Sequence, residues 1–344
     1  MTKHIPIYLI SDERYAPCLA VTLYSVMQNT SRFMDFCVLD GGISPATKEA
    51  LHNLVHETSP ESSLEFITVD ASLFSSFPDI AHFSRNTYYR YLIPNIRQNV
   101  DKALYLDSDI LVQGDIGELF DIPLNGYPLG AVPYRYELMA EDGPAIPLKQ
   151  WSQNLKAKLG LPAKHIYFNA GILLLDCAAM RRENWEARLF SLTSEKADVL
   201  ECPDQDVLNL MCAESGYCIL PDTWNAVTDI DAQLGVRLST PPNILHFTGG
   251  RRMRPWQAIG CLWDSEYWSY ASCSPLVNRM RQERIESELL HQKETLSLLL
   301  DIVVKLRRYR IFRFLLWLCG QGRQMRHLFS RLSVIQKQFP PPSI

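Results

Sequence analysis

The chain has 344 residues, of which 47% are hydrophobic and 21% are charged, and this composition excludes a wholly disordered, collagen-like or coiled-coil chain. Its formal net charge of −4 argues against a protein that binds nucleic acid along its whole length. The charge is uneven, because nine basic residues and no acidic residue follow Asp301, which indicates an acidic body with a basic C-terminal tail.

Strands and helices are predicted to alternate through the first third of the chain. Apolar runs predict buried strands, and apolar residues at a spacing near 3.6 predict helices. The expected strands lie at 5–10, 34–40, 64–69 and 102–106, and the expected helices at 16–28, 45–57 and 83–93. Such alternation is typical of an α/β fold whose mostly parallel sheet has helices on both faces.

The rest of the chain is less regular. Further strands are expected at 128–133, 167–175 and 243–248, and helices at 176–196 and 204–214. The polar stretch 137–165, with its scattered prolines, is expected to be a loop or lid. From about residue 275 the pattern is helical to about 332. We therefore expect an α/β domain at 1–270 and a helical, basic region at 271–344.

The strongest local signal is Asp107-Ser108-Asp109, which stands between two apolar runs. Two carboxylates in this setting are costly unless they bind a cation or strong hydrogen-bond donors. At the carboxyl end of a parallel strand they would point into the crevice where such sheets bind ligands. Carboxylate oxygens suit Mn²⁺ or Mg²⁺. Asp-x-Asp also occurs at 204–206 and 229–231, and the second of these is expected in a solvated loop.

His246 ends another apolar run and is followed closely by Gly249 and Gly250. A lone histidine is more often structural than a metal ligand, and that alternative stays open. However, glycine lets a backbone approach a phosphate closely, and arginine suits diphosphate recognition. The arginines that follow are Arg251, Arg252 and Arg254. Two aspartates and one histidine would form a Mn²⁺ site with open positions for substrate oxygens.

Three other segments place polar groups beside buried elements. Asn169-Ala170-Gly171 precedes a strand, and alone it would indicate a turn leading into that strand. Pro203-Asp204-Gln205 has the character of a helix N-terminus, which is compatible with Asp204 or Gln205 facing a ligand. Ser11-Asp12, at the end of the first strand, could contact a nucleotide base or cap the next helix.

Taken in order, these segments resemble glycosyltransferase family 8 from about residue 5 to about residue 268. The matching segments are LDGGIS at 39–44, TYYRYLIP at 87–94, YLDSDILV at 105–112, YFNAGILLLD at 167–176, PDQDVLN at 203–209 and HFTGG with RPW at 246–256. The resemblance implies a Rossmann-like GT-A fold and α-linked, retaining transfer of glucose or galactose from a UDP-sugar. It also implies a glycan or lipid-linked oligosaccharide acceptor, such as the core of lipopolysaccharide or lipooligosaccharide.

The resemblance further implies roles for matching positions. Asp107, Asp109 and His246 look like ligands of Mn²⁺, or of Mg²⁺. The positions that look like contacts to the sugar nucleotide are Asp12, Tyr15, Arg90, Asp107, Ser108, Ala170, Gly249 and Arg254. Those that look like the residues acting at the donor sugar are Asn169, Asp204 and Gln205, with Gln205 beneath the anomeric carbon. Where the galactosyltransferases place an aspartate, this chain has Pro133-Tyr134, so the hexose stays open.

Residues 305–318 combine arginines with Trp and Phe at helical spacing, which is typical of a helix lying in an anionic membrane surface. A helix packed on the body is the alternative, and a nucleic-acid arm is a weaker one. We expect neither a signal peptide at residues 1–12 nor a membrane span, and the sequence contains no CxxC pair. Together with the resemblance, this predicts a peripheral protein on the cytoplasmic face of the inner membrane, with no nucleic-acid partner.

Two other functions remain open at this point. A nucleotidyltransferase also uses a parallel sheet and a carboxylate-bound metal, but it needs a glycine-rich basic loop after the first strand, and residues 11–15 do not form one. A sugar-nucleotide binder without turnover is the non-catalytic alternative. The intact set of Asp107, Asp109 and His246 argues against it.

Overall fold

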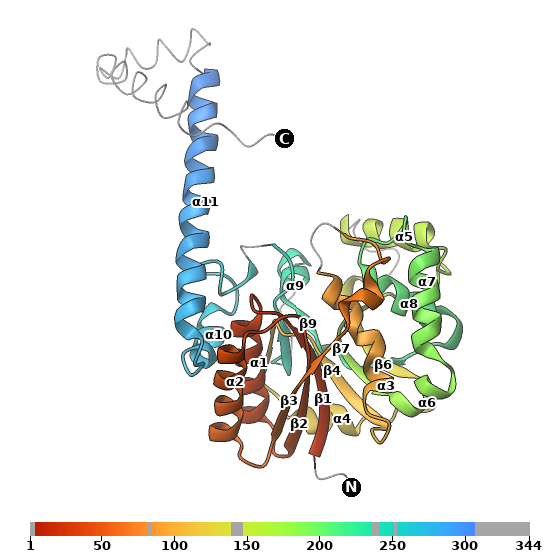
Figure 1. Ribbon diagram of the computed structural model, residues 1–344. Coiled ribbons are helices and arrows are strands. Elements are labelled where there is room, and N and C mark those ends of the chain that lie inside the picture. Colours follow the sequence, from red (N-terminus) through yellow and green to blue (C-terminus); the bar gives the residue numbers. More distant parts are fainter. Residues whose placement is uncertain (1–3, 81–83, 139–146, 235–240, 251–252, 307–344) are drawn as a thin grey trace, which may run out of the picture.

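The computed structural model describes residues 4–80, 84–138, 147–234, 241–250 and 253–306. A seven-stranded sheet forms the centre, and one long helix extends beyond the body (Figure 1). In this part of the chain no helix is both long and apolar enough to cross a membrane. The predicted membrane-surface helix at 305–318 lies almost entirely outside the described residues.

The large sheet is mostly parallel, as predicted. Its strands follow the order β3-β2-β1-β4-β7-β6-β8. Their bounds are β1 His4–Ser11, β2 Phe33–Asp40, β3 Ser63–Thr68, β4 Lys102–Leu106, β6 Leu129–Pro133, β7 Phe168–Asp176 and β8 Cys218–Ile219. The strands β1 to β4 pair in parallel, whereas β7 runs antiparallel to both β4 and β6. A small second sheet has the order β5-β10-β9, with bounds β5 Ile110–Val112, β10 Ile244–His246 and β9 Ala226–Val227.

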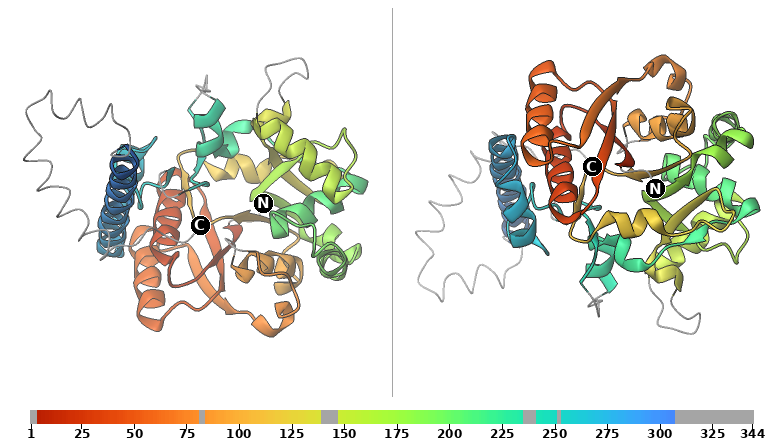
Figure 2. Two further views of the ribbon diagram at one scale, coloured as in Figure 1. Left: turned by 90° about the horizontal axis from the view of Figure 1, so that it is seen from above. Right: turned by 90° about the horizontal axis from the view of Figure 1, so that it is seen from below.

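Helices cover both faces of the large sheet (Figure 2). One face packs on α1 and α2, and the other packs largely on α8 and its neighbours. The helices are α1 Ala16–Asn29, α2 Pro45–Thr58, α3 Ile93–Ile96, α4 Ile116–Asp121, α5 Pro147–Leu159, α6 Cys177–Arg182, α7 Trp185–Glu195, α8 Pro203–Ser215, α9 Thr228–Leu234, α10 Asp264–Ala271 and α11 Val277–Leu306. Because both faces are buried, the central strands are apolar along their whole length rather than alternating.

The prediction of a loop or lid at 137–165 is wrong for much of that stretch, because α5 forms within it. Pro147 begins the helix, where a missing N–H costs nothing, and Leu155 and Leu159 bury one face of it four residues apart. Lys156 lies on the same face and pairs with Glu137 at 2.8 Å. The polar residues that suggested a loop form the solvent side of an amphipathic helix.

Two predicted helices also differ in detail. The segment predicted as a helix at 83–93 is a 3-10 helix at Arg85–Leu92, and Pro94 lies in the first turn of α3 instead of ending a helix. The helix predicted at 176–196 is broken into α6 and α7 by Asn184, whose backbone is left-handed with φ 54°. Asparagine tolerates this conformation better than most residues, which explains the break.

Candidate active site

Strand register brings three segments together at the carboxyl end of β4. Leu106, the last residue of β4, pairs with Ile172 of β7, so Asp107 follows beside Gly171, whose carbonyl accepts its N–H at 2.8 Å. Across the small sheet, His246 pairs with Ile110, next to Asp109. The sequence-predicted Asp107, Asp109 and His246 therefore meet, although 137 residues separate Asp109 from His246 (246 − 109).

The three side chains form a compact set of metal-ligating groups. One ligand atom from each lies within 4.8 Å of the others. The Nε2 atom of His246 is 3.3 Å from Oδ1 of Asp109 and 3.6 Å from Oδ2 of Asp107. The imidazole is buried, while both carboxylates are partly exposed. Two carboxylate oxygens and one imidazole nitrogen, open to solvent on one side, fit a divalent cation such as Mn²⁺.

The charges within this cluster support one another. Burial acts to lower the pKa of His246, but the carboxylates of Asp109 and Asp107 outweigh it and raise that pKa. Burial likewise acts to raise the pKa of Asp109, but His246 and Arg254 hold it below its ordinary value. Asp109 is thus kept ionised, which is the state that a metal ligand requires.

Gly171 leaves the space that this cluster occupies. A Cβ atom on Gly171 would lie 2.2 Å from Cε1 of His246 and 2.7 Å from Oδ2 of Asp107. No real side chain tolerates such contacts, so the absence of a side chain at 171 is a condition for the geometry of the site.

Arg90 links the carboxylate of Asp107 to that of Asp204. Its guanidinium lies 3.2 Å from Asp107 and 2.8 Å from Asp204, and it also donates to the carbonyl of Ala170 at 2.8 Å. It stacks over the Tyr105 ring, with 4.3 Å to the ring centroid. Burial acts to raise the pKa of Asp204 and prevails, although Arg90 and Thr87 oppose it. A planar, always charged guanidinium can hold the buried carboxylate of Asp204 and the partly exposed one of Asp107 at once, whereas an ammonium cannot.

A buried row of amides runs from His246 to the N-terminus of α8. Nδ1 of His246 lies 3.0 Å from Oδ1 of Asn225, and Asn225 donates to Oδ1 of Asn169 at 2.8 Å. Asn169 donates to Oε1 of Gln205 at 3.1 Å, and Gln205 donates to the Tyr167 hydroxyl at 3.1 Å. The sequence-predicted Asn169 and Gln205 therefore touch each other and connect to the candidate metal ligands.

Asp206 closes this row on the side of α8. Its carboxylate accepts from the Tyr167 hydroxyl and from the backbone N–H groups of Glu201 and Cys202, at 2.7 and 2.9 Å. It is fully buried, and burial raises its pKa to about 6 in spite of these hydrogen bonds. Every contact of its carboxylate is thus made within the protein, and the carboxylate holds the turn before α8.

The remaining predicted contacts surround the cluster from the α1 side. Asp12 accepts from the backbone N–H of Tyr15 at 2.9 Å in the turn that leads into α1, and Tyr15 packs against the apolar cluster that contains Trp256. The hydroxyl of Ser108 donates to the carbonyl of Ile10 at 2.6 Å. Among the described residues, Nε of Arg254 is buried without a hydrogen-bond partner. An unsatisfied cationic donor beside Asp109 suits an anionic ligand.

Gly249 has φ +83°, and its Cα lies so close to Asp229 that a Cβ would meet that carboxylate at 2.7 Å. The expectation of a solvated loop for Asp229 and Asp231 is wrong, because both belong to α9. Asp229 accepts from the Thr248 hydroxyl, and Asp231 is buried against Arg135 at 3.0 Å. A buried ion pair and a helix N-terminus account for this acidic pair better than solvation does.

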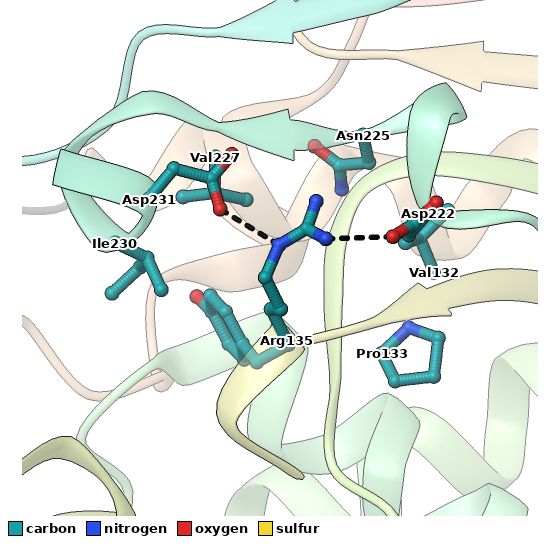
Figure 3. Close-up of a pocket in the computed structure, with 9 residues that line it drawn as sticks. Val132, Pro133, Arg135, Asp222, Asn225, Val227, Ile230 and Asp231 are labelled. Carbon is teal, nitrogen blue, oxygen red and sulfur yellow. Dashed lines mark hydrogen bonds and ion pairs between the residues drawn. The ribbon is translucent and has the colours of Figure 1, made fainter. Parts of the chain in front are cut away.

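A small pocket lies beside the amide row (Figure 3). Arg135 lies in its wall between Asp231 and Asp222, which it contacts at 3.0 and 2.7 Å. Tyr134 and Asn225 also line it. Because Tyr134 accepts from Asn169 at 3.0 Å, the pocket adjoins the group that holds Gln205.

Two residues of the site were not identified from the sequence, namely Asn225 and Tyr167. Asn225 stands in the unremarkable stretch Trp224-Asn225-Ala226, and Tyr167 begins the family-like segment YFNAGILLLD, where nothing in the sequence gives it a role of its own. An asparagine placed directly before a buried pair such as Ala226-Val227 was the one available signal, since a buried amide must find partners.

The comparisons with known proteins agree on one family. The sequence model of glycosyl transferase family 8 matches residues 6–260. The glycosyltransferase GlyF of Streptococcus pneumoniae is 29% identical over 269 residues, which are 76% of this chain and 60% of GlyF, so the chain spans less than two thirds of that relative. The lipopolysaccharide 1,2-glucosyltransferase of Escherichia coli K12 is 24% identical over 76% of this chain and 75% of its own length.

A solved structure shares the fold. The crystal structure of the galactosyltransferase LgtC, in complex with donor and acceptor sugar analogues, superposes with a TM-score of 0.65 at 26% identity. The match covers 79% of this chain and 96% of LgtC. The GT-A fold expected from the sequence is therefore confirmed. With its family match over most of its length and the fold it shares with LgtC, the chain belongs to glycosyl transferase family 8.

Proposed function

We propose that this protein is a retaining hexosyltransferase that uses Mn²⁺ and transfers glucose or galactose from a UDP-sugar to a glycan acceptor. The observation that carries the proposal is a link between the candidate metal ligands and the residues expected to face the donor sugar. Arg90 contacts Asp107 of the first group and Asp204 of the second. A diphosphate on the metal would thus hold its sugar beside Asn169 and Gln205.

Asp107, Asp109 and His246 would hold the metal, which when bound supplies positive charge against the charge that develops on the departing diphosphate. Arg254 would add to this charge, since its buried Nε lacks a partner. The left-handed turn at Gly249 would let the backbone approach the phosphates. The nucleoside end would lie toward Asp12 and Tyr15, which follow β1.

Gln205 and Asp204 would face the donor sugar. The amide of Gln205 is held by Asn169, Ala170 and Tyr167, so its position is fixed before any ligand binds. A neutral amide is a poor nucleophile, Asp204 is held by Arg90 and Thr87, and Asp206 is turned into the backbone before α8. This arrangement supports attack from the same face, in which a leaving phosphate oxygen takes the proton of the acceptor hydroxyl.

For the acceptor we propose the core of lipopolysaccharide or lipooligosaccharide. Support comes from the similarity to the lipopolysaccharide 1,2-glucosyltransferase of E. coli. We further propose that residues 1–270 form the catalytic domain, and that 271–344 attach it to the anionic cytoplasmic face of the inner membrane. The basic residues after Asp301 support this attachment through attraction to anionic lipid.

A donor screen tests the proposal. Purified full-length protein is incubated with each common UDP-sugar, with Mn²⁺ or with EDTA, and the release of UDP is measured. We expect Mn²⁺-dependent release from UDP-glucose or UDP-galactose, and loss of release in Asp109→Asn. Asp35→Asn, in an ion pair on β2, is the matched control and should keep its activity. Metal-dependent binding of UDP without release from any donor, even with a lipooligosaccharide acceptor added, would favour the non-catalytic binder.

The route of retention has its own test. Gln205→Ala should keep a substantial part of its turnover if attack occurs from the same face, because the amide then contributes only electrostatic support. Near-total loss of turnover with unchanged donor binding by calorimetry would instead assign Gln205 a covalent or otherwise essential role.

Membrane attachment is tested by removing the residues after 300. The truncated protein should stay in solution when the full chain sediments with vesicles that contain anionic phospholipid, and both should hydrolyse the donor at similar rates. Equal partitioning of the two forms would refute attachment through this region.

A further inference from the structure

The helix α11 has 30 residues, and much of it extends past the catalytic body (Figure 1). Its N-terminal half is anchored on one side only. Met280 and Ser287 are buried there, Arg284 pairs with Asp264 at 2.7 Å, and Glu283 accepts from Gln257 at 2.7 Å. These residues recur at the spacing of one helix face, so the opposite face of α11 points away from the protein's own body.

That outward face carries a regular seam. Its members alternate at spacings of four and three residues, and all of them are exposed: Asn278, Gln282, Ile285, Leu289, Gln292, Leu296 and Leu299. The four apolar members are each more than half exposed, at 56% for Ile285, 52% for Leu289, 56% for Leu296 and 53% for Leu299. A period of 3.5 residues with apolar members is the pattern by which helices pair as coiled coils.

Charges beside the seam match in one arrangement. The seam repeats every seven residues, and the repeats begin at Gln282, Leu289 and Leu296. When two copies of a helix pair in parallel and in register, the residue just before each of these positions faces the residue five places later on the partner helix. In α11 this sets Arg281 against Glu286 of the other copy and Glu288 against Lys293 of the other copy. Residues five apart are not neighbours within one helix, so these complementary pairs have no equivalent inside a single chain.

We propose that α11 is a dimerisation element that pairs in parallel, in register, with the α11 of a second copy of this chain. The seam would be buried by its own equivalent across a two-fold axis. Each catalytic body lies on the side of its helix away from the seam, so both bodies fit around the pair. The glutamines in the seam would fix the register at some cost in stability, as polar seam residues do.

A lipid surface fits this face less well. The 30 residues of α11 contain five basic and five acidic side chains, so the helix has no net charge to attract anionic headgroups. Its seam also includes two glutamines. Gln282 donates to Glu286 within the helix at 2.6 Å, and Gln292 carries an amide that an acyl phase would not satisfy but a partner glutamine can. The net positive charge that suits a membrane lies after residue 306. Dimerisation is therefore distinct from the proposed membrane attachment and does not depend on the proposed catalytic function.

Disulfide trapping tests the seam with a matched pair of variants. In the parallel arrangement, Leu289→Cys and Leu296→Cys each face their own equivalent within disulfide reach. Leu290→Cys is the control, since Leu290 is an adjacent leucine, 43% exposed, outside the seam. The full chain with each substitution is oxidised mildly, and the unsubstituted chain gives the background from native thiols such as the exposed Cys273. We expect covalent dimer from both seam variants and only background from Leu290→Cys. An antiparallel pair could link at most one of the two seam positions.

Charge exchange tests the register. Analytical ultracentrifugation of the full chain over a dilution series should show a dimer. Glu288→Lys should weaken it roughly tenfold by setting lysine against lysine, and Glu288→Lys with Lys293→Glu should restore it. Leu289→Glu with Leu296→Glu should give a monomer whose UDP release per chain is unchanged. A monomer at every concentration, or equal trapping of Leu289→Cys and Leu290→Cys, would overturn the proposal. So would a monomer that binds anionic vesicles through Leu289 and Leu296.

Discussion

His246 is oriented by Asn225, whose Oδ1 lies 3.0 Å from Nδ1 of the imidazole. The direction of this hydrogen bond follows from a backbone group, because the N–H of Gly171 donates to Oδ1 of Asn169 at 2.9 Å and so fixes that oxygen as an acceptor. Asn225 must then donate to Asn169 through its amide nitrogen, which leaves its oxygen to accept from Nδ1–H of His246. Nε2 is thereby the nitrogen presented to Asp107 and Asp109.

The first prediction concerns Asn225 as a positioning residue. Asn225→Ala should lower the affinity for Mn²⁺ about 10- to 100-fold, because His246 loses the partner that sets its orientation. Asn225→Asp keeps an acceptor for His246 but sets an oxygen against Oδ1 of Asn169, so it should damage turnover more than metal binding. Mn²⁺ titrations followed by electron paramagnetic resonance, without donor, give the affinity directly.

Asn243 offers a control for this comparison. It begins the same strand region, and its side-chain amide donates to the Thr223 hydroxyl at 3.3 Å and not to a residue of the candidate metal site. Asn243→Ala should bind Mn²⁺ as the parent chain does. If Asn225→Ala also bound Mn²⁺ normally, the orienting role of Asn225 would be excluded.

A second prediction follows from the space at Gly171. Gly171→Ala should abolish metal binding, since its Cβ would overlap His246 and Asp107, and neither can move without breaking the ligand set. Gly130→Ala is the control on the same sheet, because its Cβ would meet only leucine side chains at 3.1 Å. Circular dichroism melts should show both variants folded. Mn²⁺ binding retained in Gly171→Ala would contradict the assignment of the metal site.

The sequence was sufficient to predict most of the fold, and the reason is burial on both faces. Apolar runs such as Leu104-Tyr105-Leu106 have no other plausible place than a central strand. The α5 helix was missed although Leu148, Trp151, Leu155 and Leu159 recur at helical spacing, because polar residues fill the rest of the stretch. One of them, Lys156, shares the buried face through a long-range pair with Glu137. Such a pair is visible only in three dimensions.

The candidate site was predictable to a similar degree. The candidate metal ligands stood out because ionisable side chains interrupt apolar runs, and the resemblance to a family supplied Arg90, Asn169 and Gln205. Asn225 could not be found in this way, because its role depends on the pairing of β9 with β10, which brings it beside His246. The ion pair of Arg135 with Asp231 could not be predicted either, because the two residues lie 96 positions apart in the sequence.

A third prediction concerns the guanidinium of Arg90, which contacts two carboxylates and one backbone carbonyl. Arg90→Lys keeps the charge but cannot contact Asp107, Asp204 and Ala170 at once, so kcat/KM for donor hydrolysis should fall by roughly 100-fold or more. Removal of the cation in Arg90→Ala should also destabilise the fold by about 3–5 kcal/mol, since Asp204 would be left buried and unpaired. Urea unfolding measures this loss.

Arg97 provides the matched comparison. It also joins two carboxylates, those of Asp35 and Glu65, but its side chain is 20% exposed, against 8% for Arg90, and its carboxylate partners are 30% and 55% exposed. Arg97→Lys should therefore change the free energy of unfolding by less than about 1 kcal/mol and leave hydrolysis unchanged. If Arg90→Lys and Arg97→Lys lowered donor hydrolysis and the free energy of unfolding equally, the contacts of Arg90 would have no particular role in the site.

The last prediction is a dependence of stability on pH that originates in Asp206. Burial raises its pKa from 3.8 to about 6 in the folded protein, so between these values the folded state binds the proton more tightly than the unfolded chain. The contribution of this group to the free energy of unfolding is therefore greatest below about pH 4 and is lost as the pH rises through 6, by roughly 3 kcal/mol in all.

Asp206→Asn has no carboxyl to titrate at this position. The free energy of unfolding of the parent chain, relative to that of Asp206→Asn, should fall by roughly 1–2 kcal/mol between pH 5 and pH 8. Urea titrations at both values measure it, and a constant difference would mean that Asp206 is ionised throughout, with Tyr167 and the N–H groups of Glu201 and Cys202 outweighing its burial.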